Sequence, residues 1–192
     1  MTDTSILCKP HYFILTGGPG AGKTTVKTAL EQKGYTCVPE VARQIIREQE
    51  ATGGNAVPWK DMEAYTRLMQ EQSIATFYTG PSADNGSCFY DRGIADVICH
   101  ARLNRLPVDD ALHTAALQCR YNEHVFMFPP WEEIYCTDAE RKQTYAEAVT
   151  TYNVLCAIYR EYGYTLIEAP KVPVMERVGF VLEYLEAITK KA

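Results

Sequence analysis

The chain has 192 residues, of which 46% are hydrophobic and 22% are charged, and its seven cysteines and four histidines show no metal-ligand spacing. These features predict one globular domain, spanning residues 1–192, with reduced thiols and no structural zinc. The net charge of −5 argues against a nucleic-acid-binding protein. Because the sequence has no apolar run of membrane-spanning length and no signal-peptide pattern at residues 1–5, we expect a cytoplasmic protein.

The first predicted strand, residues 12–15, leads into GGPGAGKT at residues 17–24, which fits the P-loop pattern G-x-x-x-x-G-K-[ST]. A helical pattern follows, and strand, glycine-rich turn and helix form the context in which this motif binds phosphate. Lys23 can reach the β- and γ-phosphates, and the Thr24 hydroxyl can bind Mg²⁺. We therefore expect a bound nucleoside triphosphate, ATP with GTP as the alternative. The expected nucleotide-binding residues are Gly17, Gly18, Pro19, Gly20, Ala21, Gly22, Lys23, Thr24 and Thr25.

Four further strands are predicted at residues 35–40, 88–90, 124–128 and 164–168, and helical patterns separate them. Pro58 suits the first turn of a helix ending near Tyr78, and Thr137 with Glu140 forms a capping box for a long later helix. Alternating strands and helices require crossover connections, so we expect an α/β fold with a mainly parallel sheet and helices on both faces. The ligand of such a sheet binds beyond the carboxyl ends of the strands.

Asp91 and Arg92 follow the strand at residues 88–90, in the form of a Walker B strand whose carboxylate binds Mg²⁺. Alternatively, Asp91 caps the helix that begins near Gly93. The guanidinium of Arg92 needs an anionic partner, and phosphate is the obvious candidate.

Glu40 ends the strand at residues 35–40, beside the expected substrate position. Its carboxylate could accept a proton from an acceptor hydroxyl or orient an attacking water. Equally, Glu40 could be a structural acid at a helix N-terminus, paired with Arg43. Arg43 itself could bind a substrate anion.

Arg141 and Lys142 lie in a lid-like segment, about residues 129–145, where many P-loop kinases close arginines over the transferred phosphoryl group. The alternative is a solvated charged helix face. Trp131 could pack over a base or anchor this lid, and Arg120 is a weaker candidate for the site.

Taken together, these residues resemble the AAA_28-type P-loop ATPase domains, which are related to the nucleoside and nucleotide kinases. The resemblance covers nearly the whole chain and depends on the P-loop, on Pro-Glu-x-Ala-Arg at residues 39–43 and on Asp-Arg-Gly-Ile-x-Asp at residues 91–96. It implies a three-layer sandwich whose five-stranded parallel sheet has the order 2-3-1-4-5. It also implies that Glu40 is the base, that Asp91 and Arg92 serve metal and phosphate, and that Arg141 is a lid arginine.

Two departures limit this resemblance. The lid has no R-x-x-x-R set, and the chain has no arginine-finger, sensor or N-K-x-D pattern, which disfavours a ring-forming motor and a typical GTPase. We therefore expect an enzyme, a Mg²⁺-dependent kinase that transfers the γ-phosphoryl group of ATP to a nucleoside-like or other small acceptor. Its catalytic residues would be Lys23, Glu40, Asp91, Arg92 and Arg141, with Thr24 and Asp91 on the metal and Glu40, Arg43 and Arg92 on the acceptor.

The alternatives are an NTP-hydrolysing or NTP-sensing switch that acts through a protein or lipid partner, and a nucleotide-binding scaffold without turnover. The second is disfavoured because Lys23, Thr24 and Asp91 are all present. The sequence leaves the oligomeric state open.

Overall fold

The computed structural model of the protein describes residues 5–135 and 144–190. Five parallel strands form the central sheet, and their order is confirmed as predicted: β3 (Thr36–Val38), β4 (Cys88–Asp91), β2 (Tyr12–Gly17), β6 (His124–Phe128) and β7 (Thr165–Glu168). In the middle of the sheet, Ile14 of β2 is in register with Tyr90 of β4 and Val125 of β6. The P-loop therefore leaves the central strand.

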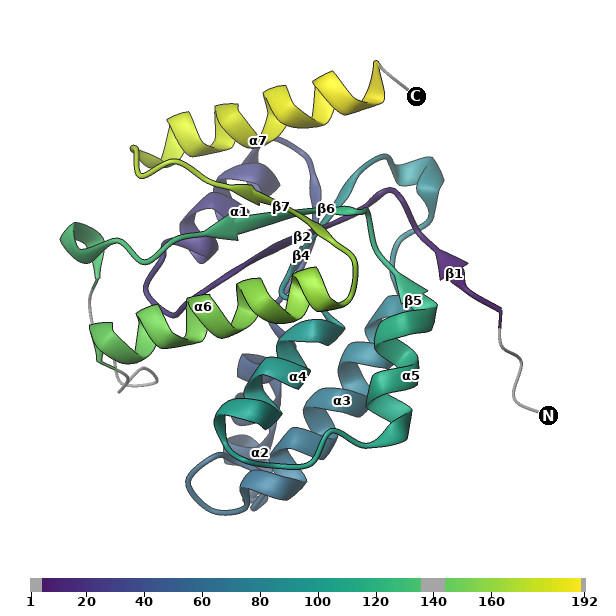
Figure 1. The fold of residues 1–192 in the computed structure, drawn as a ribbon, viewed down its shortest axis with the longest axis vertical. Coiled ribbons are helices and arrows are strands. Elements are labelled where there is room, and N and C mark those ends of the chain that lie inside the picture. Colours follow the sequence, from purple (N-terminus) through teal and green to yellow (C-terminus); the bar gives the residue numbers. More distant parts are fainter. Residues whose placement is uncertain (1–4, 136–143, 191–192) are drawn as a thin grey trace.

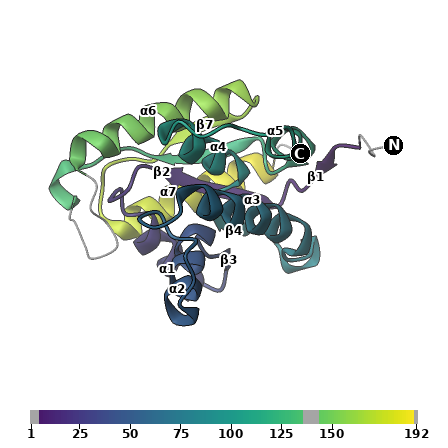
Figure 2. The ribbon, with the colours of Figure 1, turned by 90° about the horizontal axis from the view of Figure 1, so that it is seen from below.

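Helices cover both faces of this sheet and make three layers (Figures 1 and 2). One face carries α1 (Lys23–Gln32) and α7 (Val174–Thr189). The other face carries α2 (Val41–Thr52), α3 (Met62–Thr79), α4 (Ile94–Leu103), α5 (Asp110–Gln118) and α6 (Tyr145–Glu161). The chain thus has the doubly wound α/β architecture that its alternating pattern predicts.

The core consists of two apolar layers, separated by the sheet. Along β2, Tyr12 and Ile14 belong to the layer under α2–α6, whereas Phe13 and Leu15 belong to the layer under α1 and α7. This alternation follows from the two-residue period of a strand. All six residues of β2 are buried, as expected for a central parallel strand covered on both faces.

Two predicted helix starts differ from the structure. Pro58 lies in a turn before α3, and Asp61 caps that helix by accepting the Ala64 N–H at 2.9 Å, because a carboxylate can satisfy a free amide and proline cannot. The long helix α6 begins at Tyr145, where Thr144 and Glu147 form the capping box. Thr137 and Glu140, for which that role was predicted, lie outside the described residues.

Several short elements have no clear signal in the sequence. The two-residue strands β1 (Leu7–Cys8) and β5 (Cys119–Arg120) pair in parallel, away from the main sheet (Figure 1). Short 3₁₀ turns form at η1 (Ala83–Asn85) and η2 (Glu132–Ile134). Of these, η2 follows β6 at the carboxyl edge of the sheet, the edge at which the P-loop leaves β2.

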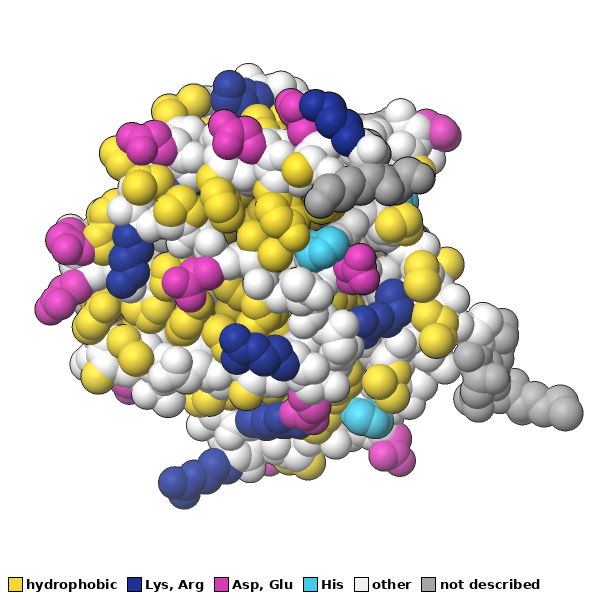
Figure 3. All heavy atoms as spheres, turned by 45° about the horizontal axis from the view of Figure 1, so that its top comes forward, with side chains coloured by type: hydrophobic (Ala, Val, Ile, Leu, Met, Phe, Trp, Pro, Cys, Tyr) yellow, Lys and Arg dark blue, Asp and Glu magenta, His cyan; other side chains and the backbone are white. Residues whose placement is uncertain are grey.

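The surface carries charges of both signs. On the face shown in Figure 3, Lys and Arg side chains alternate with Asp and Glu side chains around bands of hydrophobic ones. Across residues 5–135 and 144–190, no helix has the length and apolar character needed to cross a membrane.

Candidate nucleotide and acceptor site

The P-loop connects β2 to α1 at the carboxyl edge of the sheet. Lys23, the first residue of α1, is only 7% exposed, and its ammonium group donates to the carbonyls of Gly17 at 2.9 Å and Gly18 at 2.8 Å. Gly22 has φ 78°, a left-handed conformation that favours glycine, and a Cβ there would lie 2.6 Å from Nη1 of Arg177. The loop backbone therefore depends on glycine for both its conformation and its close packing.

Burial and the nearby Arg92 lower the pKa of Lys23 to about 7, although Asp91 and Glu40 act in the opposite direction. A phosphate beside this ammonium group would favour its charged form. Lys23 is thus held in a place where an anionic ligand compensates an otherwise costly buried charge.

Glu40 lies between two arginines. Its Oε1 accepts from Nε of Arg92 at 2.7 Å, and its Oε2 accepts from Nε of Arg43 at 3.1 Å. Glu40 is the N-cap residue of α2, yet its side chain makes no capping hydrogen bond. Its carboxylate therefore faces the carboxyl edge of the sheet and is held there by charge pairs.

The carboxylates of Glu40 and Asp91 have different protonation tendencies. Burial alone would raise the pKa of Glu40, but Arg92, Lys23 and Arg43 override it and lower that pKa to about 2. Burial and the neighbouring Glu40 raise the pKa of Asp91 to about 6. The two carboxylates are therefore suited to different tasks.

Asp91 is the end residue of β4 and is 5% exposed. The N-cap of α4 is Gly93, so the capping role weighed for Asp91 is not the one it has. Its Oδ1 is buried without a hydrogen-bond partner among the described residues. An orphaned carboxylate oxygen beside the P-loop fits a cation or its bound water.

The residues at this edge of the sheet fit Mg²⁺, which phosphates help to bind, better than a metal ion whose ligands all come from protein side chains. Within the described ranges, no three His, Cys, Asp or Glu side chains gather as a metal-binding group. Mg²⁺ needs only one or two protein oxygens when phosphates supply the others. Thr24, which is exposed, and Asp91 could provide these oxygens.

A small pocket, with a cavity volume of about 20 Å³, lies between the residues that follow β3 and β4 and the helices α2, α3 and α4. Its polar wall holds Glu40, Asp91, Arg92 and Asp96, and Ser73 adds a hydroxyl. The remaining wall is formed by Val41, Ala42, Met69, Gly93 and Val97. A cavity of this size holds about one water molecule, and its lining combines charged groups with an apolar side.

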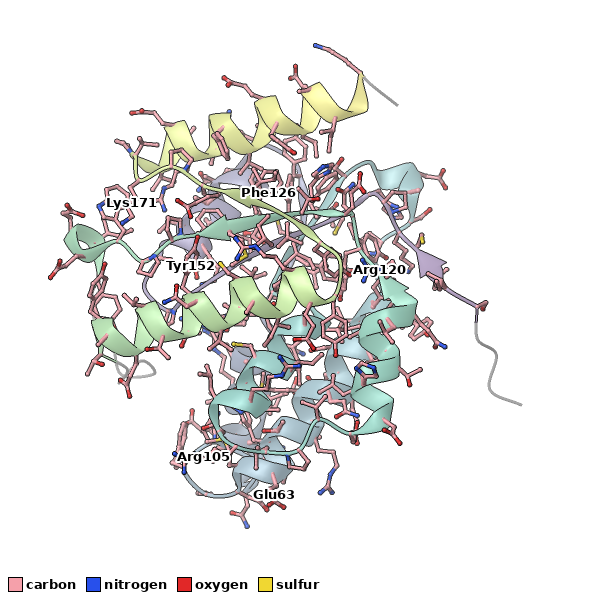
Figure 4. The ribbon with its side chains drawn as sticks, viewed as in Figure 1. Glu63, Arg105, Arg120, Phe126, Tyr152 and Lys171 are labelled. Atoms are coloured by element: carbon pink, nitrogen blue, oxygen red, sulfur yellow. The ribbon has the colours of Figure 1, made fainter. Side chains whose placement is uncertain are left out.

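The structure thus brings together Lys23, Glu40, Arg43, Asp91 and Arg92 at one edge of the sheet. Arg141 and Lys142 lie outside the described residues. Arg120 lies at the other end of the sheet. In Figure 4 it is on the side opposite Lys171, which follows the carboxyl end of β7, and its Nη1 donates to the Tyr162 carbonyl at 2.8 Å.

Two residues near the site were missed in the sequence. Asp96 is buried at the start of α4, where an acid three residues after an N-cap is a recognisable signal. Arg177 of α7 donates to the Ala21 carbonyl of the P-loop at 3.1 Å, and its guanidinium lies 5.3 Å from the ring centroid of Trp131. The contact with Arg177 favours an anchoring role for Trp131. Because Arg177 and Ala21 are 156 residues apart, no local sequence pattern predicts their contact.

A parallel sheet in this order, with a P-loop after its central strand, defines a P-loop protein with the fold of the nucleoside and nucleotide kinases. The sequence model of the AAA domain family AAA_28 matches residues 12–177. The chain therefore belongs to this family, as the residues at 39–43 and 91–96 predict. No curated protein sequence matches it significantly.

Solved structures share the fold at low sequence identity. A NadR protein in complex with NR superimposes with a TM-score of 0.69 at 17% identity, over 92% of this chain and 50% of that one. A deoxyadenosine kinase from M. mycoides gives 0.60 at 14% identity, over 92% and 99% of the two chains. A shikimate kinase from Acinetobacter baumannii gives 0.56 at 16% identity, over 92% and 93%. The chain thus spans about half of the NadR protein and nearly all of the two kinases.

Proposed function

We propose that this protein is a Mg²⁺-dependent kinase that transfers the γ-phosphoryl group of ATP to a hydroxyl of a nucleoside-like or other small acceptor. The observation that carries the proposal is the cluster of Glu40, Asp91 and Arg92 at the carboxyl edge of the sheet, whose charges act on Lys23 of the P-loop. Beside this cluster, the apolar side chains of Val41, Met69 and Val97 would give an organic acceptor a surface to pack on.

Glu40 is the residue that would hold the acceptor hydroxyl. With its pKa lowered to about 2 by Arg92, Lys23 and Arg43 against the effect of burial, Glu40 is charged at neutral pH and accepts hydrogen bonds well. A carboxylate of such low pKa is a weak base, so it takes the proton late, as the new O–P bond makes the hydroxyl acidic. Its main contribution is then to orient the acceptor oxygen toward the γ-phosphate.

Lys23 and Arg92 would stabilise the charge of the transferred phosphoryl group, and we propose Arg141 as a third cation from the lid-like segment at about residues 129–145. Thr24 and Asp91 are the residues that would hold Mg²⁺. When bound, this ion neutralises charge on the β- and γ-phosphates.

The acceptor class draws support from the fold relatives. Deoxyadenosine kinase and shikimate kinase are named for small hydroxyl-bearing compounds, and both match over more than 90% of this chain.

Acceptor dependence tests the proposal. The purified protein, with ATP and Mg²⁺, is assayed for ADP release alone and with a panel of nucleosides and small polyhydroxy acids. The proposal predicts slow release alone and a marked increase with at least one class of acceptor. Fast release that no acceptor increases would favour the NTP-hydrolysing switch instead.

A further inference from the structure

Asp96 is a buried carboxylate with four hydrogen-bond donors. It is 5% exposed and lies in the first turn of α4. Its Oδ1 accepts from the Thr16 hydroxyl at 2.5 Å and from Nη1 of Arg92 at 2.9 Å. Its Oδ2 accepts from the Gly93 N–H at 2.9 Å and from the Tyr159 hydroxyl at 2.5 Å. One side chain thus connects β2, the start of α4, and α6.

Arg92 is held at both ends of its guanidinium. Nε donates to Glu40 and Nη1 donates to Asp96, so two carboxylates fix the plane of the group. Its backbone has φ 77°, an unfavourable conformation for a residue other than glycine. The Arg92 N–H donates to the Leu15 carbonyl at 3.1 Å, and Asp96 holds the following N–H, of Gly93. Asp96 therefore supports both the side chain and the strained turn of Arg92.

Tyr159 brings α6 into this network. A Cβ at Gly93 would lie 3.2 Å from the Tyr159 hydroxyl and 2.6 Å from Cδ1 of Ile14, so a side chain there would crowd the approach of Tyr159. The same helix, α6, follows the lid-like segment in the chain. A hydrogen-bonded chain therefore runs from α6 through Asp96 and Arg92 to Glu40.

We propose that Asp96 is a positioning residue that sets the Arg92 guanidinium against Glu40 and couples it to helix α6 through Tyr159. Asp96 acts through Arg92 and does not itself contact the transferred group. The kinetic consequence of this proposal rests on the proposed kinase reaction, whereas the orientation of Arg92 can be measured without it.

The first test compares Tyr159→Phe with Tyr164→Phe. Both tyrosines are buried, with ring centroids 5.5 Å apart, but the Tyr164 hydroxyl bonds the backbone of Tyr121 instead of Asp96. We expect Tyr159→Phe to lower kcat by about three- to tenfold with KM for ATP changed less than about twofold, and Tyr164→Phe to leave both near wild type. Equal losses of kcat in the two variants would overturn the proposal.

The second test needs no activity. In ¹⁵N-labelled protein, the Nε–H resonance of Arg92, assigned with Arg92→Lys, should exchange slowly with solvent because it is donated to Glu40. Asp96→Asn, and more weakly Tyr159→Phe, should accelerate this exchange, by about tenfold for Asp96→Asn. Unchanged exchange in both variants would refute the positioning role. Tyr159→Phe keeps the ring, so the test stands even if Asp96→Asn does not fold. Absence of phosphoryl transfer in the wild type would refute the proposed function alone.

Discussion

An arginine–glutamate pair lies at each end of α4. The two pairs have the same hydrogen-bond distance but differ in burial and in the number of bonds. Before the helix, Arg92 meets Glu40 at 2.7 Å, and near its end Arg102 meets Glu161 through two bonds of 2.7 Å. The first pair has side chains 20% and 16% exposed, whereas the second has 41% and 48%. The second pair has the better geometry, yet water screens it.

The two pairs are therefore distinguished by burial and surroundings and not by distance. Lys23 and Asp91 lie around Arg92. Burial and Arg92 lower the pKa of Lys23, whereas burial and Glu40 raise the pKa of Asp91. Around Arg102 the groups are solvated, and the pair joins the ends of α4 and α6. The protein thus concentrates poorly solvated charge at the carboxyl edge of the sheet, where an anionic ligand would be stabilised.

The largest expected effect is a difference in the free energy of unfolding between variants that break these two pairs. Arg92→Ala would leave Asp96 buried without its cation and Glu40 with only one of its two arginines, and we expect it to lower the free energy of unfolding by about 3–5 kcal/mol. Arg102→Ala should cost less than about 1 kcal/mol, because its pair is exposed. Urea denaturation of both variants measures this difference, and equal losses would refute the distinction between the two ends of α4.

The next effect is on catalysis at the P-loop. Lys23→Ala removes the cation nearest the expected phosphates and should lower kcat by about a hundredfold to a thousandfold. Lys33→Ala, an exposed lysine after the same helix, should leave kcat unchanged. Steady-state kinetics with saturating ATP make the comparison. Similar activities of the two variants would remove Lys23 from the mechanism.

Replacement of Glu40 tests the acceptor side. Glu40→Gln keeps the shape but removes the charge that orients the acceptor hydroxyl, so we expect kcat to fall by about a hundredfold. Glu48→Gln serves as the matched control, because Glu48 is exposed on the same helix and its carboxylate accepts from the Gln44 side chain at 2.8 Å. If phosphoryl transfer survives Glu40→Gln while Lys23→Ala abolishes it, Glu40 has a structural role only.

A smaller effect concerns pH. Because burial and Arg92 hold the pKa of Lys23 near 7 in the free protein, its charge is lost as the pH rises above 7, whereas bound phosphate favours the protonated form. Binding then takes up a proton, and the affinity for ATP should fall by up to about tenfold per pH unit above that value. Calorimetry in buffers of different ionisation enthalpy measures the proton uptake. Lys23→Arg, always charged, should show a flat profile.

Much of this site could be predicted from the sequence, because a parallel sheet collects the ends of its strands. The P-loop, Glu40 and Asp91-Arg92 each follow an apolar strand, so knowing the fold places them at one edge. The contact between Glu40 and Arg92 joins residues 52 positions apart and depends on β3 and β4 being neighbours, which the predicted strand order already implied.

The remaining features come from tertiary contacts that have no local pattern. The left-handed φ of Arg92, the four donors around Asp96 and the reach of Arg177 to Ala21 all depend on side chains from distant elements. Arg120, the weaker candidate for the site, precedes β6 and therefore lies at the amino end of that strand. There its guanidinium lies 4.1 Å from the Tyr164 ring centroid. Whether a residue lies at the carboxyl or the amino end of its strand therefore decides whether it can reach the site.

The most direct test of the account is a crystal structure with a non-hydrolysable ATP analogue, Mg²⁺ and the acceptor that the activity panel identifies. The account predicts the acceptor in the pocket between α2, α3 and α4, with its reacting hydroxyl about 2.6–3.2 Å from the Glu40 carboxylate and directed at the γ-phosphate. An acceptor bound elsewhere, or a hydroxyl that Glu40 does not reach, would contradict it.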